Sequence, residues 1–257
     1  MRELISPNVT RIKHTGVKYP NQHPTCIVHP NGVYEIDTLV NAMPGENFNI
    51  VEGLFRDYQD AGHLYDVSVT GLKTSDNARV GSQRFCTMDR ALAQQITDVV
   101  NNLGILQQIV KTAADNCRFV EEFIGCSSYF RFMRYTKGGE HFPHYDSDFQ
   151  FVNDPMVYTR FTVVAYFTNN VTGEIAFVND PRENHGNTDW DRQATNEEIT
   201  LKIAPKRGKI VIFPHDLPHT VLPYEGKLEG DSIFNAADDG VRMIARGDLV
   251  FGMQTYL

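Results

Sequence analysis

The chain has 257 residues, of which 41% are apolar, so it can bury the core of one large domain or two small ones without disulfide staples. Its net charge of -8 argues against an extended nucleic-acid-binding face, which requires clustered Lys and Arg, so we expect no nucleic-acid partner. No run approaches the length of a membrane span, and the first residues lack the apolar core of a secretion signal. We therefore expect a soluble, cytoplasmic protein with no membrane partner.

The cysteines point to no redox or zinc chemistry. The four are widely spaced and form no CxxC pair: Cys26, Cys86, Cys117 and Cys126. We expect reduced structural thiols.

Residues 1 to about 86 mix glycine, proline and asparagine with short alternating stretches such as 32–40, a pattern typical of strands and loops. From Thr87 the apolar period becomes that of a helix, with Thr87 as a candidate N-cap and Gly104 as a stop signal. A second amphipathic helix is expected over 105–117. The two helices should cover one side of a sheet.

From about residue 127 the chain reads as short strands separated by turn residues, which favours an antiparallel barrel or sandwich. Two polar stretches interrupt it, 225–240 and 181–198, and the latter holds the single tryptophan, Trp190. The stretch 181–198 is either a surface insert or a lid over a site. The expected strands are 129–135, 160–167, 174–178, 199–203, 209–213 and 242–251.

The segment 134–146, with the sequence RYTKGGEHFPHYD, contains a candidate metal site. Side chains at positions i and i+2 of a strand share a face, so His144 and Asp146 can bind one ion together. The glycine pair at 138–139 lets the backbone turn tightly just before them. His141 is offset by three from His144, and on a regular strand it would face away from the site as a bystander.

A second source of histidine lies at 213–223, with the sequence FPHDLPHTVLP. His215 and His219 are four apart, as in a helical metal pair, but Pro214 and Pro218 make a helix improbable there. On a loop only one histidine need face the site, and the spacing favours neither. Either would complete a set of two imidazoles and one carboxylate, which leaves metal positions open and suits non-haem Fe(II) oxygen chemistry.

The order of short motifs over about residues 129–251 resembles the Fe(II)- and 2-oxoglutarate-dependent dioxygenases, specifically the prolyl 4-hydroxylase-like catalytic domain. An Arg-Tyr, a glycine turn and HxD come first, within 134–146. The later motifs are Thr162 four before Tyr166, Gly173-Glu174 before Phe177, Pro205 and Gly208 before Phe213, His219 four before Pro223, and Gly240-Val241-Arg242. The first 120 residues carry no such resemblance.

The resemblance implies a mainly β fold with flanking helices (α+β), built on a double-stranded β-helix core of the jelly-roll, cupin-like kind. We expect this catalytic core at 127–257. Residues 1–126, with strands, loops and two supporting helices, should pack on it to form one compact unit.

The resemblance also implies roles for individual residues. His144, Asp146 and His219 become the expected Fe(II) ligands and catalytic residues, the last because the family's distal histidine has a proline four residues later. A basic residue anchors the far carboxylate of 2-oxoglutarate in this family. Arg242 follows a glycine as that residue does, but it lies 23 positions after His219 where about ten is usual, and Arg246 on the same strand is the rival anchor. The further expected 2-oxoglutarate contacts are Tyr166 and Tyr135.

The implied activity is that of an Fe(II)- and 2-oxoglutarate-dependent dioxygenase that uses O2, with ascorbate as a candidate reductant. It would hydroxylate an unactivated C–H bond of a small-molecule or amino-acid-like substrate while 2-oxoglutarate is decarboxylated to succinate and CO2. The carboxylate of Asp146 favours hydroxylation over halogenation, since related halogenases carry Gly or Ala there. Desaturation and ring closure stay open.

Several alternatives remain: a peptidyl-prolyl hydroxylase of a protein substrate, a non-catalytic metal-binding barrel, or a cupin-like enzyme without an oxo acid. The nucleic-acid repair branch is disfavoured, because its closing strand has an asparagine between two arginines and 242–246 has none. The candidate substrate contacts are Arg79, Arg84, Arg160 and Trp190.

Overall fold

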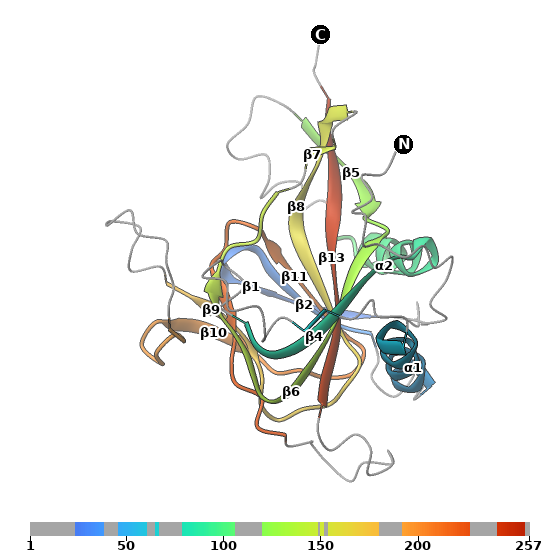
Figure 1. The fold of residues 1–257 in the computed structure, drawn as a ribbon. Coiled ribbons are helices and arrows are strands. Elements are labelled where there is room, and N and C mark those ends of the chain that lie inside the picture. Colours follow the sequence, from blue (N-terminus) through green and yellow to red (C-terminus); the bar gives the residue numbers. More distant parts are fainter. Residues whose placement is uncertain are drawn as a thin grey trace.

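The structure, a computed structural model, describes residues 24–38, 46–60, 65–66, 79–105, 120–148, 150–151, 154–179, 192–226 and 241–254. These residues form one curled antiparallel sheet of 13 strands, with two α-helices on one side of it (Figure 1). The helices are α1 (Glu46–Asp60) and α2 (Arg90–Asn102), and a short 3-10 turn η1 spans Pro30–Gly32. The strands are β1 (Thr25–His29), β2 (Val33–Asp37), β3 (Tyr65–Asp66), β4 (Arg79–Met88), β5 (Val120–Cys126), β6 (Tyr129–His144), β7 (Gln150–Phe151), β8 (Asp154–Tyr166), β9 (Ile175–Val178), β10 (Ile199–Ile203), β11 (Lys209–Pro214), β12 (His219–Val221) and β13 (Val241–Gln254).

The long strand β6 turns the sheet back on itself and so creates two layers. Its residues 131–136 pair with β13, and its last part, 141–144, pairs with β12. The strand order β1-β2-β11-β8-β13-β6-β12-β9-β10 therefore passes from a broad layer, through β6, into a small layer of β12, β9 and β10. This is the double-stranded β-helix that the sequence predicts.

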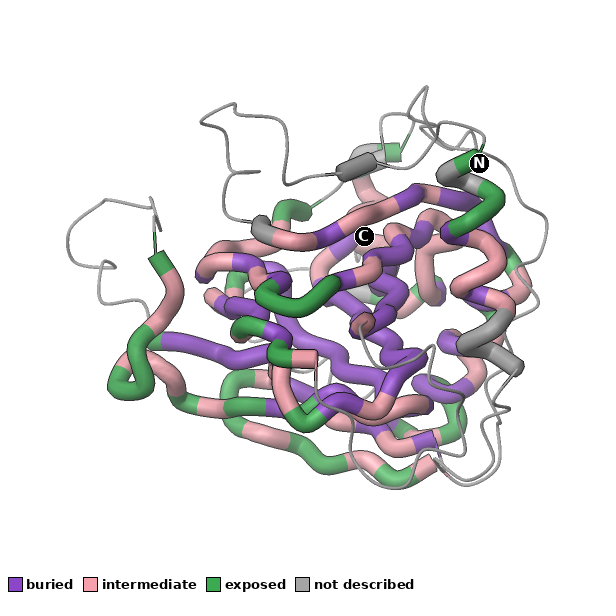
Figure 2. Tube along the Cα trace, turned by 60° about the horizontal axis from the view of Figure 1, so that its bottom comes forward, coloured by how far each residue is buried: buried purple, intermediate pink, exposed green. Residues whose placement is uncertain are grey.

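The broad layer has two apolar faces, because successive side chains of a strand point to opposite sides. Its outer face packs against the helices, which Figure 1 shows on the side away from β9 and β10, and its inner face looks towards the small layer. Buried residues follow both faces (Figure 2). The outer cluster includes Phe130, Phe132, Phe161, Val163, Ala245 and Phe251 with Phe55, Leu92 and Ile96 of the helices. The inner cluster includes Met133, Tyr135, Val164, Tyr166, Phe213 and Ile244 with Ile175, Phe177 and Val221 of the small layer.

Helix α2 runs where the sequence predicts and ends just before Gly104, whose φ of 63° suits a glycine. The predicted N-cap is wrong: Thr87 lies in β4, and the Asp89 carboxylate caps the helix by accepting from the N–H of Leu92 at 2.9 Å. The second predicted helix lies almost wholly outside the described residues.

Helix α1 forms in a stretch for which the sequence predicted only strands and loops. It docks on the outer face through Phe55, whose ring meets that of Phe85 edge-on with centroids 4.8 Å apart. Arg134 of β6 reinforces this contact, since it pairs with Glu52 of α1 at 2.9 Å. The helix therefore depends on tertiary contacts with β4 and β6.

All six predicted strands are present, and β6 and β8 are longer than predicted. Strands β1, β2 and β4 from the first part of the chain join the same sheet as the later strands. Among the described cysteines, Cys26, Cys86 and Cys126 are free thiols, as expected, and Cys117 lies outside the described residues. Neither helix of the described chain is long and apolar enough to cross a membrane.

The corner of β6 depends on two glycines. Gly138 has a φ of 81°, and a Cβ on Gly139 would lie 2.7 Å from the Thr136 carbonyl oxygen and 2.8 Å from that of Gly81. Both neighbours are backbone atoms, so a Cβ at this position could be accommodated only if the strand backbones moved.

We predict that Gly139→Ala destabilises the fold by about 1–3 kcal/mol, because the added methyl group forces the backbones of β4 and β6 apart. Thermal unfolding followed by circular dichroism measures the effect. The matched control is Gly53→Ala in α1, where a Cβ meets nothing within 4 Å and helix propensity should hold or raise the melting temperature. Equal melting temperatures for the two variants would contradict this role of the corner.

Candidate active site

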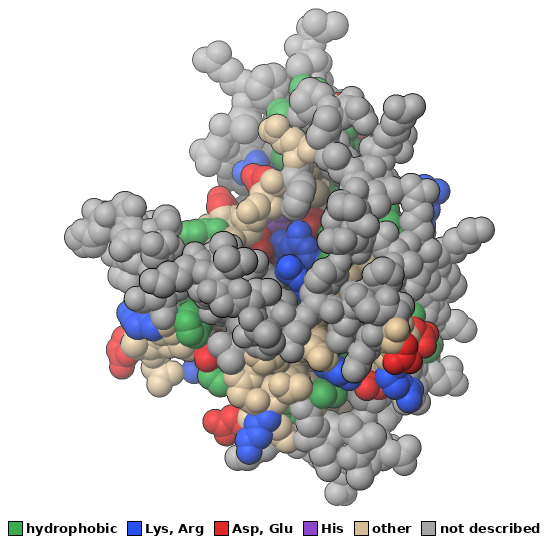
Figure 3. Space-filling model, viewed as in Figure 1, with side chains coloured by type: hydrophobic (Ala, Val, Ile, Leu, Met, Phe, Trp, Pro, Cys, Tyr) green, Lys and Arg blue, Asp and Glu red, His purple; other side chains and the backbone are tan. Residues whose placement is uncertain are grey.

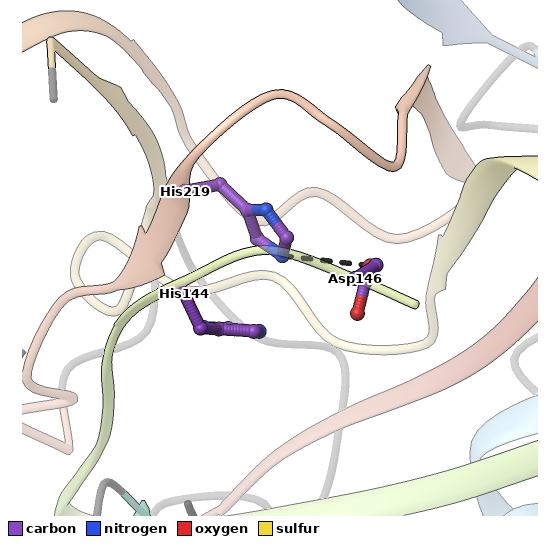
Figure 4. Close-up of side chains that lie close together, drawn as sticks. All are labelled: His144, Asp146 and His219. Atoms are coloured by element: carbon purple, nitrogen blue, oxygen red, sulfur yellow. Dashed lines mark ion pairs between the residues drawn. The ribbon is translucent and has the colours of Figure 1, made fainter. Parts of the chain in front are cut away.

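Three side chains converge where β6 and β12 meet at the open end of the inner face (Figure 4). His144 ends β6, Asp146 follows in the next loop, and His219 begins β12. One ligand atom of each lies within 4.8 Å of the other two. Two imidazoles and one carboxylate at this separation fit one metal ion bound on one side, which is the geometry of non-haem iron sites.

Both imidazoles are oriented by the backbone. Nδ1 of His144 is 2.8 Å from the Phe142 carbonyl oxygen, and Nδ1 of His219 is 3.0 Å from that of Leu217. A carbonyl accepts the Nδ1 proton and thereby leaves Nε2 with its lone pair for a metal. Burial lowers the pKa of His219, against the opposing effect of Asp146, and so favours the neutral imidazole that a metal requires.

Asp146 is held in its ionised form by its neighbours. Arg246 Nη2 lies 2.9 Å from Oδ1, and the Thr162 hydroxyl donates to Oδ2. Burial alone would raise the pKa of Asp146, but Arg246, the two histidines and the Thr162 hydroxyl hold it well below the usual range of a carboxyl. The result is a buried carboxylate charged at neutral pH.

The prediction that His144 and Asp146 lie on one strand is wrong in detail. Strand β6 ends at His144, and the N–H of Asp146 donates instead to the His215 carbonyl oxygen at 3.1 Å. Contacts with other strands therefore bring Asp146 to the site.

His215 belongs to a separate network. Its Nδ1 is 2.8 Å from Asp148, and its Nε2 is 3.2 Å from Asp248. Burial would lower the pKa of His215, but the two carboxylates outweigh it and raise that pKa. Two neighbouring carboxylates favour the protonated imidazole, which has no lone pair for a metal, and the cluster of three contains His219 rather than His215.

The prediction that His141 faces away from His144 is wrong. Their rings stack with centroids 3.6 Å apart, and His141 is buried. The reason is an irregular register, in which His219 pairs with His144 but Val221 pairs with His141. Two steps on β12 match three on β6, so the alternation of side chains is interrupted there.

The two arginines of β13 have different surroundings. Arg246 lies between two carboxylates, 2.9 Å from Asp146 and 3.2 Å from Asp248. Arg242 is 1% exposed, donates to the Gly173 carbonyl oxygen, and forms no ion pair with any described residue. Its Nε also lacks a hydrogen-bond partner in the described part of the chain. A buried guanidinium without an anion fits a site that receives one.

Two tyrosines surround Arg242. The Tyr135 ring lies beneath the guanidinium, with its centre 4.3 Å from the central carbon. The positive charge of Arg242 also interacts with Tyr166 of β8. Burial raises the pKa of Tyr166, so its phenol stays protonated and can donate. The expected cosubstrate residues Arg242, Tyr135 and Tyr166 are thus brought together, and Arg246 stands apart beside Asp146.

Sequence reasoning missed three contributors. Thr162 was noted only for its spacing from Tyr166, whereas its hydroxyl contacts Asp146. Asp248 shares the inward side of β13 with Arg246, a signal that alternation could have provided. Gln193 donates to the Val221 carbonyl oxygen at 3.1 Å and accepts from the Thr220 hydroxyl next to His219. No sequence pattern predicts this position. Of the predicted substrate contacts, Trp190 and the side chain of Arg79 lie outside the described residues.

Residues 130–230 match the family model described as the 2OG-Fe(II) oxygenase superfamily. This stretch is therefore similar to the 2OG-Fe(II) oxygenases. The match agrees with the enzyme class expected from the motifs, a 2-oxoglutarate-dependent non-haem iron dioxygenase, and with the expected Fe(II), 2-oxoglutarate and O2. No curated protein matches the chain.

Several solved structures are similar to this chain. The structure of OsALKBH1 is 12% identical and covers 86% of this chain and 99% of its own, with a TM-score of 0.53, which shows a common fold. A Pseudomonas putida prolyl-4-hydroxylase is 15% identical over 86% of this chain and 92% of its own, with a TM-score of 0.43. HygX from Streptomyces hygroscopicus, with nickel, 2-oxoglutarate and hygromycin B bound, is 12% identical over 88% of this chain and 84% of its own, with a TM-score of 0.38.

We predict that Arg246→Gln destabilises the metal-free protein by about 3–5 kcal/mol near neutral pH, because it leaves Asp146 and Asp248 buried without their cation. In the wild type both carboxyls have pKa values below the ordinary range. Their stabilising effect is therefore present above the unfolded pKa of about 4 and is lost as the pH falls below it. The difference between wild type and variant should shrink as the pH drops through this range.

Denaturant unfolding in the presence of a chelator, at a series of pH values, measures this difference. Arg90→Gln on the exposed start of α2 removes the same charge and serves as the control. A deficit for Arg246→Gln that does not change with pH would contradict the assignment of its partners.

Proposed function

We propose that the protein is an Fe(II)- and 2-oxoglutarate-dependent dioxygenase that hydroxylates an unactivated C–H bond of a small-molecule or amino-acid-like substrate. One observation carries the proposal: ligand atoms of His144, Asp146 and His219 lie within 4.8 Å of one another, and backbone carbonyls occupy both Nδ1 atoms. These three residues would bind Fe(II) through two Nε2 atoms and one carboxylate oxygen. Such a ligand set leaves positions for an oxo acid and O2.

We assign the far carboxylate of 2-oxoglutarate to Arg242. The planar fork of a guanidinium can donate two parallel hydrogen bonds to a carboxylate, and this guanidinium is buried without one among the described residues. Tyr166 can add a hydroxyl donor, and the Tyr135 ring limits where the guanidinium can move. Arg246 is the weaker candidate, because it already pairs with two carboxylates.

Bound Fe(II), 2-oxoglutarate and O2 supply the oxidative decarboxylation to succinate and CO2 together with the oxidation of a substrate C–H bond. The residues of the chain would bind and orient these groups and shield them from water. Arg246 and Thr162 hold the two oxygens of Asp146 in place. Phe213 packs 4.5 Å from the ring of His219, centroid to centroid, and Phe177 lies beyond it, so water is excluded from that side of the imidazole.

We further propose that 127–257 form the catalytic core and that 1–126 support it. The ligand residues and both β13 arginines come from the later part of the chain. Both described helices from the earlier part pack on the outer face, away from the ligand set.

We predict that His219→Ala lowers the affinity for Fe(II) at least tenfold and abolishes 2-oxoglutarate turnover, because it removes one of three ligands. Metal binding is measured by equilibrium dialysis, and turnover by succinate formation with Fe(II), O2 and ascorbate in a substrate screen. His215→Gln is the matched control, since its ring contacts Asp148 and Asp248 instead. Loss of metal binding in His215→Gln with retention in His219→Ala would reverse the assignment.

The same screen separates the remaining functions. Tight metal binding with no succinate formed under any condition would favour a non-catalytic barrel. Turnover only with proline-containing peptides would favour a peptidyl-prolyl hydroxylase.

We predict that Arg242→Met raises the KM for 2-oxoglutarate about 10- to 100-fold, since hydrogen bonds to a charged group contribute about 1.5–3 kcal/mol. Arg242→Lys should raise the KM less, because it keeps the positive charge but lacks the two parallel donors of the guanidinium. Steady-state kinetics with 2-oxoglutarate as the varied component give both values, with Arg90→Gln as the control. An unchanged KM in Arg242→Met would point to a cupin-like enzyme without an oxo acid.

A further inference from the structure

The inner face of the broad layer carries more cations than the proposed iron chemistry uses. In the β13–β6 register, Arg242 lies opposite Tyr135, and Arg246 lies opposite Arg131. Side chains directly opposite on neighbouring strands share a face. Arg131 therefore points to the same side of the sheet as Tyr135 and Arg246, towards the proposed iron site.

One more arginine joins this face. On β4, Arg84 pairs with Met133 of the inner cluster, whereas its neighbour Phe85 stacks on Phe132 of the outer cluster. The arginines of the inner face, apart from the proposed anchor Arg242, are therefore Arg84, Arg131 and Arg246.

Among the described residues, the carboxylates near these arginines do not balance them. Asp146 and Asp248 both pair with Arg246. Arg131 attracts Asp248 from a distance and lies 5.8 Å from the centre of the Tyr129 ring, but it forms no ion pair with a described residue. Arg84 likewise has no ion-pair partner among the described side chains, and both arginines are partly buried.

Arg131 lies directly opposite Arg246, and like charges on neighbouring strands repel. Asp248 offsets part of this repulsion, and a bound anion between the strands would offset more of it. Figure 3 shows a hollow on the molecule where Lys or Arg side chains lie beside acidic and His side chains, so cations, carboxylates and imidazole meet at a surface that a small molecule can reach.

We infer that Arg131 and Arg84 bind an anionic group of the substrate, a carboxylate or a phosphate monoester, and so hold its C–H bond towards the metal ligands. The inference rests on the proposed function and narrows its substrate class. A guanidinium fork matches both oxyanions in two-point hydrogen bonding. The net charge of -8 repels polyanions at long range, so a small anion fits better than a nucleic acid.

The test uses the full chain loaded with redox-inert Mn(II) and saturating 2-oxoglutarate, so that a probe cannot occupy the cosubstrate site. Calorimetric titration compares L-glutamate with L-glutamine and O-phospho-L-serine with L-serine, which differ mainly in charge. A short single-stranded DNA forms a further arm. We expect at least one anion to bind at least tenfold more tightly than its neutral partner, a difference of about 1.4 kcal/mol.

The variants separate substrate recognition from a structural role. Arg131→Gln and Arg84→Gln should each reduce the preference for the anion over its neutral partner about tenfold, and Arg131→Lys should keep part of it. The ratio is informative because misfolding would weaken both partners alike. Arg90→Gln removes an exposed charge from α2 and should leave the ratio unchanged.

Equal binding within both pairs, no binding of either anion at millimolar concentration, or an unchanged ratio in Arg131→Gln would overturn the inference. Tighter binding of the DNA than of both small anions would overturn it in favour of a nucleic-acid substrate. Failure of 2-oxoglutarate to bind the Mn(II)-loaded chain would instead refute the proposed function, so the two failures are distinguishable.

Discussion

The site depends on one ion pair, between Asp146 and Arg246. A buried carboxylate can bind a metal only if it stays ionised, and burial opposes ionisation. Arg246 Nη2, 2.9 Å away, supplies the compensating charge, and the Thr162 hydroxyl donates a hydrogen bond to the same carboxylate. Because Asp146 lies in a loop after β6, this contact with β13 also fixes where the carboxylate stands relative to His219.

Strand β13 consequently positions several residues of the site and also contributes to the core under the helices. Its inward residues alternate with outward ones such as Met243 and Ala245, which pack under the helices. Arg242 faces the two tyrosines, and four residues on, Arg246 reaches the carboxylate. This central strand pairs with both β6 and β8, so the sheet fixes the distance between the proposed anchor and the proposed metal ligands.

Local patterns predicted local structure well. The six later strands and α2 were predicted because alternation and helical periodicity are visible within a few residues. Helix α1 was missed because its stability comes from contacts such as that of Phe55 with Phe85, thirty residues away, which no window reveals. The N-cap prediction failed because β4 extends through Thr87 and shifts the start of α2 to Asp89.

The sequence by itself determined the chemistry on offer: a histidine and a carboxylate two apart, two later histidines, two arginines after a glycine, and the order of motifs that points to an oxygenase. Only the tertiary structure shows which of these groups meet. It places His219, which the family resemblance had already selected over His215, beside Asp146, turns His141 towards His144, and separates Arg242 from Arg246. The physical reason is that the direction of a side chain on a strand depends on register and bulges, which pairing between distant segments sets.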